Sequence, residues 1–288
     1  MQKITPFIWF ENTLDEAMNA YASLFRDGEI IERVAMDHHG PNGNSTVTIG
    51  KVRLAGCEIG GGDFGPAFSP TPAISFFVDC ETADEVDHLW HSLVDGGSVL
   101  MELGEYPFSP HYGWLQDRFG VNWQISQSGT PQKITPCLLF VGDQFGRAGE
   151  AMQLYTRVFD NSSIGNVFRG DKEQVSYGAF TLAGQPFIIM EDDSDHQFTF
   201  TEGLSLVVDC DDQAEVDHYW NALTANGGQE SMCGWLKDPF GVSWQITPRR
   251  LMELSADPDR EKAGRVIRAM LQMQKIEIDK LEAAANAG

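Results

Sequence analysis

The chain repeats itself, and this constrains its fold more than any other feature of the sequence. Residues 112–125 read YGWLQDRFGVNWQI, and residues 233–246 read CGWLKDPFGVSWQI. A second matched pair lies upstream: ISFFVDCETADEVDHLW starts at Ile74 and LSLVVDCDDQAEVDHYW starts at Leu204. Both copies also open with QKITP. Three matched blocks in the same order indicate duplication of a whole domain.

The spacing between the copies changes at one place. The offset from Ile74 to Leu204 is 130 residues, whereas the offset from Gly113 to Gly234 is 121. The first copy therefore carries nine extra residues, within SVLMELGEYPFSPHY, where the second copy has QESM. We expect the copies to share a framework and to differ at one rim.

Composition restricts the possible partners. A chain of 288 residues with 42% hydrophobic content is long enough for two ordinary domains. Its 20 basic and 42 acidic residues give a net charge of −22, which would repel nucleic-acid phosphates and anionic membrane surfaces, so we expect neither partner.

Targeting signals and cysteine usage suggest a compartment. The start of the chain lacks the basic and apolar regions of a signal peptide, and no apolar run approaches the roughly 20 residues that span a bilayer. The five cysteines are odd in number and form no CxxC motif. Together these features predict an acidic cytoplasmic protein with reduced thiols.

Hydrophobic periodicity predicts four βαβββ modules, two in each copy. Helical spacing recurs at residues 14–25, 83–94, 149–159 and 213–223, and strand-like stretches follow each helix. The segment 60–72, rich in glycine and proline, is expected to be a loop. We predict a first domain at 1–129, a second at 130–248 and a helical extension at 249–288.

An apolar stripe runs along the extension from Val266 to Leu281. Such a stripe predicts an amphipathic helix that packs against its own protein. A role in dimerisation is the alternative, so the sequence is compatible with a monomer or a homodimer.

These motifs resemble those of the vicinal oxygen chelate superfamily, which includes glyoxalase I, fosfomycin- and bleomycin-resistance proteins, and extradiol dioxygenases. Within it they resemble the PhnB-like group, often labelled demethylubiquinone methyltransferase-like, through KITP, VDCxxxxEVDxxW and GWLxDxFGVxWQI. The resemblance covers residues 2–247 in two passes. It implies an α+β fold of tandem paired βαβββ modules with a C-terminal helical tail. It does not imply one reaction, because function lies in the site rather than the fold.

The resemblance also implies where metal ligands would lie. The closing motif of the metal enzymes normally carries a Glu, where this chain has Gln124 and Gln245. The other ligand positions fall on or near Pro6 or Phe7, Pro136 or Cys137, Ala73 and Gly203. Apart from Cys137, none of these side chains is a metal donor, so we expect no cofactor. The alternative is a divalent metal held by Gln124 or Gln245 with donors such as Glu58 or Glu191.

Two further patterns favour structural roles. Gly60-x-Gly62-x-x-Gly65 matches a dinucleotide-binding fingerprint in form, but prolines and then a strand follow it rather than a helix. Cys80 and Cys210 recur in both copies beside acidic residues, which raise a thiol pKa, so we expect packed thiols rather than nucleophiles.

Alternation along the strands predicts a binding hollow. In a one-layer curved sheet with helices outside, the Ile/Val parity faces the helices and the other parity faces the hollow. The second parity gives the ligand-binding residues Phe7, Trp9, Ser75, Phe77, Asn122 and Gln124 in the first copy, and Leu139, Ser205, Val207, Ser243 and Gln245 in the second. Aromatic walls with a few amides and hydroxyls suit a small, mostly apolar ligand.

We therefore interpret the chain as a metal-free binder of a small apolar or aromatic molecule, with sequestration by bleomycin-resistance proteins as the model. One alternative is a divalent-metal-dependent lyase, isomerase or dioxygenase of the same superfamily. Another is a structural or partner-binding protein whose side chains fill the hollows. The sequence leaves open whether a reaction is catalysed, and it indicates neither catalytic residues nor the ligand.

Overall fold

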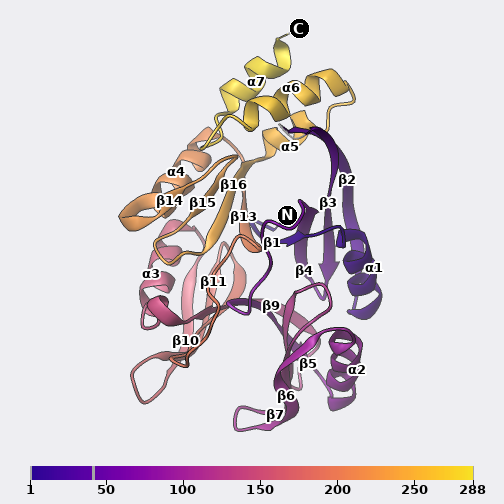
Figure 1. Cartoon of the computed structure of the whole chain (residues 1–288). Helices are drawn as coiled ribbons and strands as arrows, with labels where there is room; N and C mark the ends of the chain where they lie inside the picture. The colour runs from indigo at the N-terminus through magenta and orange to yellow at the C-terminus, as the bar shows by residue number, and fades with distance from the viewer. Residues whose placement is uncertain (1, 41–42, 288) are drawn as a thin grey trace. The chain divides into compact units, whose positions relative to one another are not determined.

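The computed structural model describes the backbone of residues 2–40 and 43–287 and the side chains of residues 2–35 and 47–287. It confirms the α+β class, with four βαβββ modules followed by helices (Figure 1). The first copy contains β1 (Ile4–Phe10), α1 (Leu14–Leu24), β2 (Glu29–Gly40), β3 (Gly43–Leu54), β4 (Cys57–Asp63), β5 (Ile74–Cys80), α2 (Ala83–Val94), β6 (Ser98–Tyr106), β7 (Ser109–Gln116) and β8 (Asn122–Gln127).

The second copy repeats this order and then adds the tail. It contains β9 (Lys133–Phe140), the 3-10 turn η1 (Gly142–Gln144), α3 (Ala148–Val158), β10 (Ser163–Arg169), β11 (Val175–Leu182), β12 (Gln185–Glu191), β13 (Leu204–Cys210), α4 (Gln213–Thr224), η2 (Ala225–Gly227), β14 (Gln229–Glu230), β15 (Trp235–Lys237) and β16 (Ser243–Pro248). The tail consists of α5 (Arg249–Ser255), α6 (Arg260–Met270) and α7 (Ile278–Asn286). No helix in the described part of the chain is long and apolar enough to cross a membrane.

The strands form two mixed eight-stranded sheets, and each sheet takes one module from each copy. The first sheet has the order β14-β15-β16-β13-β1-β4-β3-β2, and the second has the order β10-β11-β12-β9-β5-β8-β7-β6. In the second sheet β5 and β9 pair in antiparallel fashion, which places Phe77 opposite Thr135. The domain boundaries at 129 and 248 stay a prediction, since sheet membership cuts across the copies.

The chain divides into two compact units. The larger unit comprises residues 6–34 and 48–204 and holds the whole second sheet, and the smaller unit is built mainly on residues 205–287.

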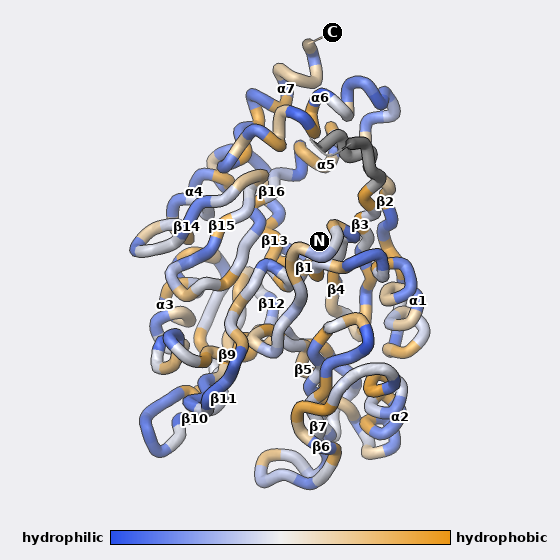
Figure 2. The backbone as a smooth tube through the Cα atoms, in the orientation of Figure 1, coloured by the Kyte–Doolittle hydropathy of each residue, from blue (hydrophilic) through white to orange (hydrophobic). Residues whose placement is uncertain are grey.

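Helix packing in the larger unit follows the expected strand parity. The helix α2 buries Val86, Leu89, Trp90 and Leu93, and its tube alternates between apolar and polar residues (Figure 2). The ring of Trp90 covers Gly113 so closely that a Cβ there would lie 2.3 Å from a ring carbon. Gly113 is therefore needed so that α2 can approach β7.

Trp123 of β8 is packed on the side of the second sheet that faces the helices. Its ring centroid lies 5.1 Å from that of Phe76, 5.3 Å from that of Tyr21 and 4.9 Å from that of Phe25. Trp123 is fully buried at 0% exposure. The parity of Phe76 and Trp123 therefore faces the helices, as the alternation predicts.

The sequence D-x-F-G-V-x-W, which both copies share in the closing motif, is organised around one buried carboxylate. Asp117 is 4% exposed. Its Oδ1 accepts hydrogen bonds from the backbone N–H groups of Phe119 at 2.8 Å and Val121 at 3.0 Å. Its Oδ2 accepts from the indole N–H of Trp123 at 2.8 Å and from the hydroxyl of Tyr21 at 2.6 Å. One side chain thus ties the turn, the last strand and α1 together.

The second copy repeats this arrangement. Asp238, 2% exposed, accepts from the backbone N–H groups of Phe240 at 2.9 Å and Val242 at 3.1 Å, and from the indole of Trp244 at 2.9 Å. A motif that looks like a site in the sequence is therefore a folding element in both copies.

The expected loop at 60–72 was wrong for residues 60–63, which belong to β4. Gly60, Gly61 and Gly62 pair with residues 7 to 9 of β1. A Cβ at Gly60 would lie 2.9 Å from the ring of Phe7, and one at Gly61 would lie 2.6 Å from the ring of Phe10. These glycines make room for aromatic rings on a strand, and they build no phosphate-binding turn.

The tail differs from the single predicted helix, because residues 271–277 separate α6 from α7. Its apolar stripe packs within the tail itself, in a cluster with α5 that contains Leu251, Leu254, Val266, Met273, Ile276, Leu281 and Ala285. The backbone carbonyls of Met273 and Gln274 accept hydrogen bonds at 2.7 Å from Cys233 and Gly234. The tail therefore packs beside the site where the second copy lacks the nine extra residues.

We predict that Asp117→Asn lowers the free energy of unfolding by about 2–4 kcal/mol, because an amide cannot accept from four donors without turning its own N–H groups toward some of them. Urea denaturation followed by tryptophan fluorescence measures this loss. Asp160→Asn, at an exposed position, is the matched control and should change stability by less than about 0.5 kcal/mol. Equal stability of the two variants would contradict the assigned role.

Candidate functional site

The inner face of the second sheet, defined as the face away from α2 and α3, carries the candidate site. Gly113 of β7 faces Trp90 of α2, and a Cβ at Gly178 of β11 would lie 3.3 Å from the sulfur of Met152 in α3. Since neighbouring strand residues point to opposite faces, residues 112, 114 and 177 lie on the inner face.

A buried polar cluster occupies the centre of the inner face. The amide N–H of Gln124 donates to the hydroxyl of Ser75 at 2.8 Å and lies 3.6 Å from the sulfur of Cys137. The hydroxyl of Tyr112 donates to the amide oxygen of Gln124 at 2.7 Å. All four side chains are at most 3% exposed. Burial raises the pKa of the Tyr112 hydroxyl well above its ordinary value, so it stays a donor.

The same glutamine–serine pair recurs in the smaller unit. There Gln245 of β16 donates to the hydroxyl of Ser205 in β13 at 2.9 Å. The Gln of the closing motif therefore links the last strand to its parallel neighbour in both sheets, at the position where the metal enzymes of the superfamily place a Glu.

The predicted ligand-binding residues fall into separate groups. The inner face of the second sheet brings together Ser75, Phe77, Asn122, Gln124 and Leu139, which come from both copies. Ser205, Val207, Ser243 and Gln245 belong to β13 and β16 of the smaller unit. That they contact a ligand stays a prediction.

Phe7 and Trp9 lie in the first sheet, on β1, within an aromatic cluster of their own. The rings of Phe7 and Trp9 lie 6.0 and 4.8 Å from the ring of Phe64, and the indole N–H of Trp9 donates to the carbonyl of Gly65 at 2.6 Å. These contacts hold the loop after β4. The prediction that both residues share one hollow with Ser75 and Gln124 does not match the sheets, because β1 lies in the first sheet and β5 and β8 lie in the second.

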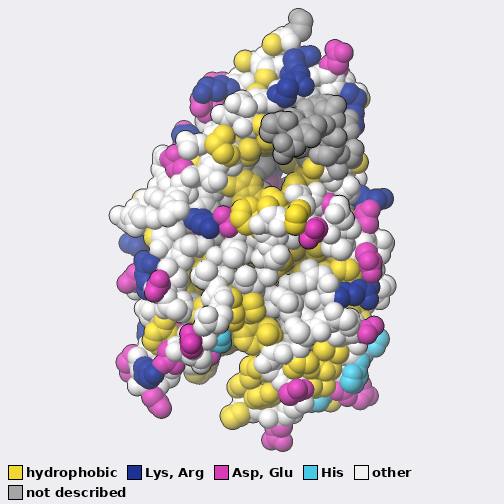
Figure 3. Space-filling view, in the orientation of Figure 1, with side chains coloured by type: hydrophobic (Ala, Val, Ile, Leu, Met, Phe, Trp, Pro, Cys, Tyr) yellow, Lys and Arg dark blue, Asp and Glu magenta, His cyan; other side chains and the backbone are white. Residues whose placement is uncertain are grey.

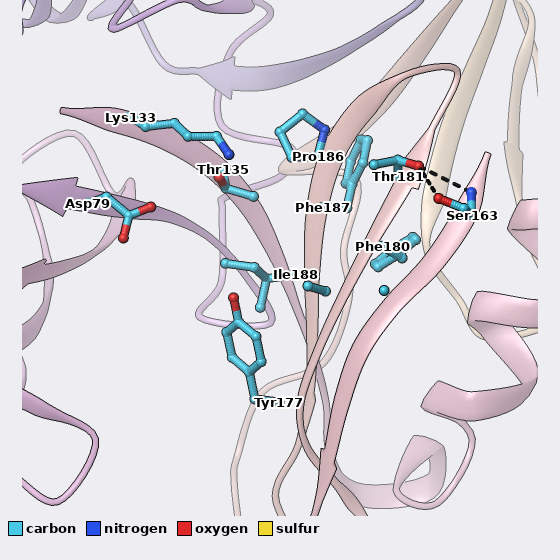
Figure 4. Close-up of a pocket in the computed structure, with 12 residues that line it drawn as sticks. Asp79, Lys133, Thr135, Ser163, Tyr177, Phe180, Thr181, Pro186, Phe187 and Ile188 are labelled. Carbon is cyan, nitrogen blue, oxygen red and sulfur yellow. Dashed lines mark hydrogen bonds between the residues drawn. The ribbon is translucent and has the colours of Figure 1, made fainter. Parts of the chain in front are cut away.

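An open pocket of about 200 Å³ lies beside the polar cluster on the inner face. In Figure 4 one side of the pocket is lined by Asp79, Lys133, Thr135, Tyr177 and Ile188, and the other side is lined by Ser163 and Thr181. Its lining comprises Asp79, Lys133, Thr135, Ser163, Gly165, Tyr177, Ala179, Phe180, Thr181, Pro186, Phe187 and Ile188. None of the eleven predicted residues is among them.

The pocket carries two opposite charges, on Asp79 and Lys133, and the half-buried phenol of Tyr177. Asp79 and Lys133 are opposite each other in the pairing of β5 with β9. Burial raises the pKa of the Asp79 carboxyl, and Lys133 and Ser128 oppose the rise. Burial, followed by the charge of Asp79, raises the pKa of the Tyr177 hydroxyl. The pocket thus offers a carboxylate, an ammonium and a neutral hydroxyl above apolar side chains.

The sequence did hold a signal for part of this pocket. Lys133 and Thr135 belong to the KITP block and Asp79 to the VDC block, and both blocks recur in the two copies. The alternation of side chains along a strand places Lys133 and Thr135 on the face opposite Ile134, and it places Asp79 on the face opposite Val78. For Tyr177 the repeat offered no signal, because its strand is not among the matched blocks.

The donors present do not fit the metal that the superfamily implies. Within the described residues, no group of three or more His, Cys, Asp or Glu side chains is placed to hold a metal ion. Both carboxylate oxygens of Glu191 are occupied, accepting from the backbone N–H of Ala148 at 2.8 Å and of Val175 at 2.5 Å. Glu58 pairs with Arg53 at 3.0 Å. Gln124 has both ends engaged in the polar cluster.

Four of the five thiols are buried and stay protonated in the folded chain. All five cysteines are free, and four of them are buried. Burial, as the main cause, raises the pKa values of Cys57, Cys80, Cys137 and Cys210 to about 12. The sequence predicts that acidic neighbours raise the pKa of the Cys80 thiol. Burial is the larger cause of the rise, and the charges of Glu85 and Asp79 are smaller causes.

We predict that the partly exposed Cys233 reacts with a disulfide reagent at pH 8 faster than the other four thiols, although burial raises the pKa of its thiol as well. The other four should react only after denaturation, because at pH 8 a thiol with a pKa of about 12 is almost entirely protonated. Absorbance of the released thiolate counts the reactive groups. Cys233→Ser should abolish the fast phase, and a fast phase that survives this change would contradict the assignment.

Comparisons with known proteins place the chain in a family. The family model described as 3-demethylubiquinone-9 3-methyltransferase matches residues 2–126 and again residues 132–247. The PhnB protein from Bacillus cereus is 42% identical over 44% of this chain and 100% of its own, with a TM-score of 0.41. A protein from Staphylococcus aureus is 30% identical over 44% of this chain and 97% of its own, with a TM-score of 0.19.

A more distant match shows the fold alone. Glyoxalase I from Zea mays is 10% identical over 84% of this chain and 92% of its own, with a TM-score of 0.54. A search of curated proteins found no match. The vicinal oxygen chelate fold and the PhnB-like resemblance are thus confirmed, and the chain belongs to the 3-demethylubiquinone-9 3-methyltransferase family as two tandem copies.

Proposed function

We propose that the chain binds a small, mostly apolar molecule in the pocket on the inner face of the second sheet, and that it needs no metal to do so. The pocket beside the polar cluster carries this proposal. It joins apolar walls, such as Ile188 and Pro186, to a few polar groups at Asp79, Lys133 and Thr135, which is the usual composition of a ligand site.

The volume supports a ligand of one or two rings. A dry apolar cavity of about 150 Å³ is enough to bind benzene. The pocket measures about 200 Å³ and is open to one side, so a larger molecule could extend beyond it along the inner face. The two opposite charges and the hydroxyls would orient the polar end of such a ligand.

Sequestration is the simplest role for such a site. The centre of the inner face is filled by four hydrogen-bonded side chains, and it offers no activated nucleophile because burial raises the pKa of Cys137 to about 12. This supports binding over covalent catalysis, in the manner of the bleomycin-resistance relatives.

The family's descriptive name refers to methyl transfer, and the features of this chain do not favour that activity. The triple glycine at residues 60–62 lies inside β4, where aromatic rings cover it. Both sheets are mixed, whereas the doubly wound nucleotide-binding folds have a mostly parallel sheet with a glycine-rich turn into a helix.

We predict that a library of one- and two-ring compounds, screened by ligand-observed NMR in the presence of EDTA, yields saturable binders. Tyr177→Ala should weaken such a binder about tenfold by removing an aromatic wall, and Thr135→Val should weaken it less. Met232→Ala, at a side chain 46% exposed in the smaller unit, is the control and should leave affinity unchanged.

Two results would overturn the proposal. One is the absence of any saturable binder, and the other is affinity that is unaffected by both Tyr177→Ala and Thr135→Val. Binding that appears only after a divalent ion is added would instead favour the metalloenzyme alternative.

A further inference from the structure

An aromatic row runs from the tip of the β6–β7 hairpin to the middle of the inner face. The ring centroids of Tyr106 and Phe108 lie 5.6 Å apart, and the ring of Tyr112 lies 5.4 Å from Tyr106 and 5.0 Å from Phe108. Phe77 of β5 continues the row at 6.4 Å from Tyr112. We name these four rings the aromatic row.

The row is continuous with the proposed pocket. Phe77 lies opposite Gln124 in β8 and opposite Thr135 in β9. Thr135 lines the pocket. A ligand that extends out of the pocket along the inner face would therefore meet Phe77, whose ring neighbours that of the buried Tyr112.

The outer end of the row is exposed in a way that folding does not explain. Phe108 is 66% exposed, and Val99 and Leu100 of the same hairpin are each 40% exposed. Figure 3 shows apolar side chains gathered over this part of the molecule. Phe108 lies at the tip of the hairpin, whereas Val99 and Leu100 lie at the start of β6. Exposed apolar side chains gathered on one element are typical of a binding surface.

The nine extra residues of the first copy build this hairpin. The β6 and β7 strands span nine and eight residues, whereas their counterparts β14 and β15 span two and three. At the corresponding edge of the second copy, the backbone N–H groups of Cys233 and Gly234 instead donate hydrogen bonds to the tail carbonyls of Met273 and Gln274. The aromatic row is thus an addition to one copy of a shared framework.

The indole of Trp114 lies beside the row, and its donor has no hydrogen-bond partner among the described residues. Trp114 follows Gly113 in β7, so its side chain lies on the inner face, opposite Gln124 in β8. Its Nε1 is buried, which is a costly state for an unpaired donor. On the neighbouring strand the fully buried Asn122 has an Oδ1 that likewise lacks a partner in the described part of the chain. A ligand oxygen beside the row would satisfy the indole.

We propose that the ligand is a planar aromatic molecule with an oxygen substituent, which stacks on the aromatic row through its ring and accepts a hydrogen bond from the Trp114 indole. This inference rests on the proposed binding function and names its ligand class. Rings at these spacings offer offset and edge-to-face contacts that a saturated ring of equal size cannot match.

The test compares three probes of one size by calorimetric titration. They are 2-naphthol, its saturated analogue decahydro-2-naphthol, and naphthalene, which lacks the oxygen. We expect 2-naphthol to bind about tenfold more tightly than the saturated analogue, because only the planar ring stacks. We expect 2-naphthol to bind more tightly than naphthalene as well, because naphthalene has no oxygen that could accept a hydrogen bond from the indole N–H.

Three variants test whether the aromatic row and the Trp114 indole produce the preference for 2-naphthol. Phe108→Ala, at a side chain too exposed to support the core, should weaken 2-naphthol about five- to tenfold and change the saturated analogue by less than about twofold. Trp114→Phe keeps an aromatic side chain but removes the N–H donor, so it should erase the preference for 2-naphthol over naphthalene. Met232→Ala serves again as the neutral control.

The outcomes separate this inference from the binding function. If Tyr177→Ala weakens a library binder while Phe108→Ala has no effect on any probe, the pocket stands and the aromatic row is not part of the site. If sedimentation shows that Phe108→Ala dissociates a dimer without changing probe affinity, the row is a self-association surface and the inference is overturned. If neither the library nor the probes bind, both proposals fail.

Discussion

The fold depends on a buried carboxylate at the start of each closing motif. Asp117 and Asp238 are almost fully buried, and each accepts from two backbone N–H groups and from an indole. These bonds set the turn, and the turn sets the register of the last strand. A shift of one residue would exchange the two faces of that strand, because side chains alternate. Trp123 would leave the core, and Gln124 would leave the inner face.

The same constraint decides how much of the inner face remains for a ligand. With the register set, Gln124 reaches Ser75 and Tyr112 and closes the centre of the second sheet. The open pocket then lies to the side, where Asp79 and Lys133 meet. A glutamine at this place is a hydrogen-bonding link between parallel strands in both sheets.

The two sheets differ at the positions equivalent to the pocket. Asp209, the counterpart of Asp79, forms an ion pair of 2.9 Å with Arg249 at the start of the tail. Lys3, the counterpart of Lys133, pairs with Glu215 at 2.6 Å. In the smaller unit these charges therefore serve the attachment of the tail and of the N-terminal strand. Asp79 and Lys133 line an open pocket instead.

Much of the framework could be read from the repeat and from periodicity. The helix α2 has the predicted bounds, because Val86, Leu89, Trp90 and Leu93 form one apolar stripe. Other elements depended on contacts that no local pattern reveals. The start of α1 is capped by Asp63, whose Oδ1 accepts from the backbone of Thr13 and Leu14 at 3.0 and 3.1 Å, and Thr13 itself makes no side-chain cap. Likewise, Gly60 to Gly62 look like a loop until the rings that cover them are known.

The sequence by itself determined the family, the modules and the face on which each strand residue lies. The modules and faces depend on the two-residue period of strands and the 3.6-residue period of helices, and the family depends on short motifs. All of these are local features of the sequence. Only the tertiary structure decided which modules share a sheet, and hence that Thr135 and Tyr177 of one copy meet Asp79 of the other. Because the copies carry nearly the same strands, local pattern favours pairing within a copy and across copies equally. The choice is made by long-range contacts such as β5 with β9, and the pocket exists because of that choice.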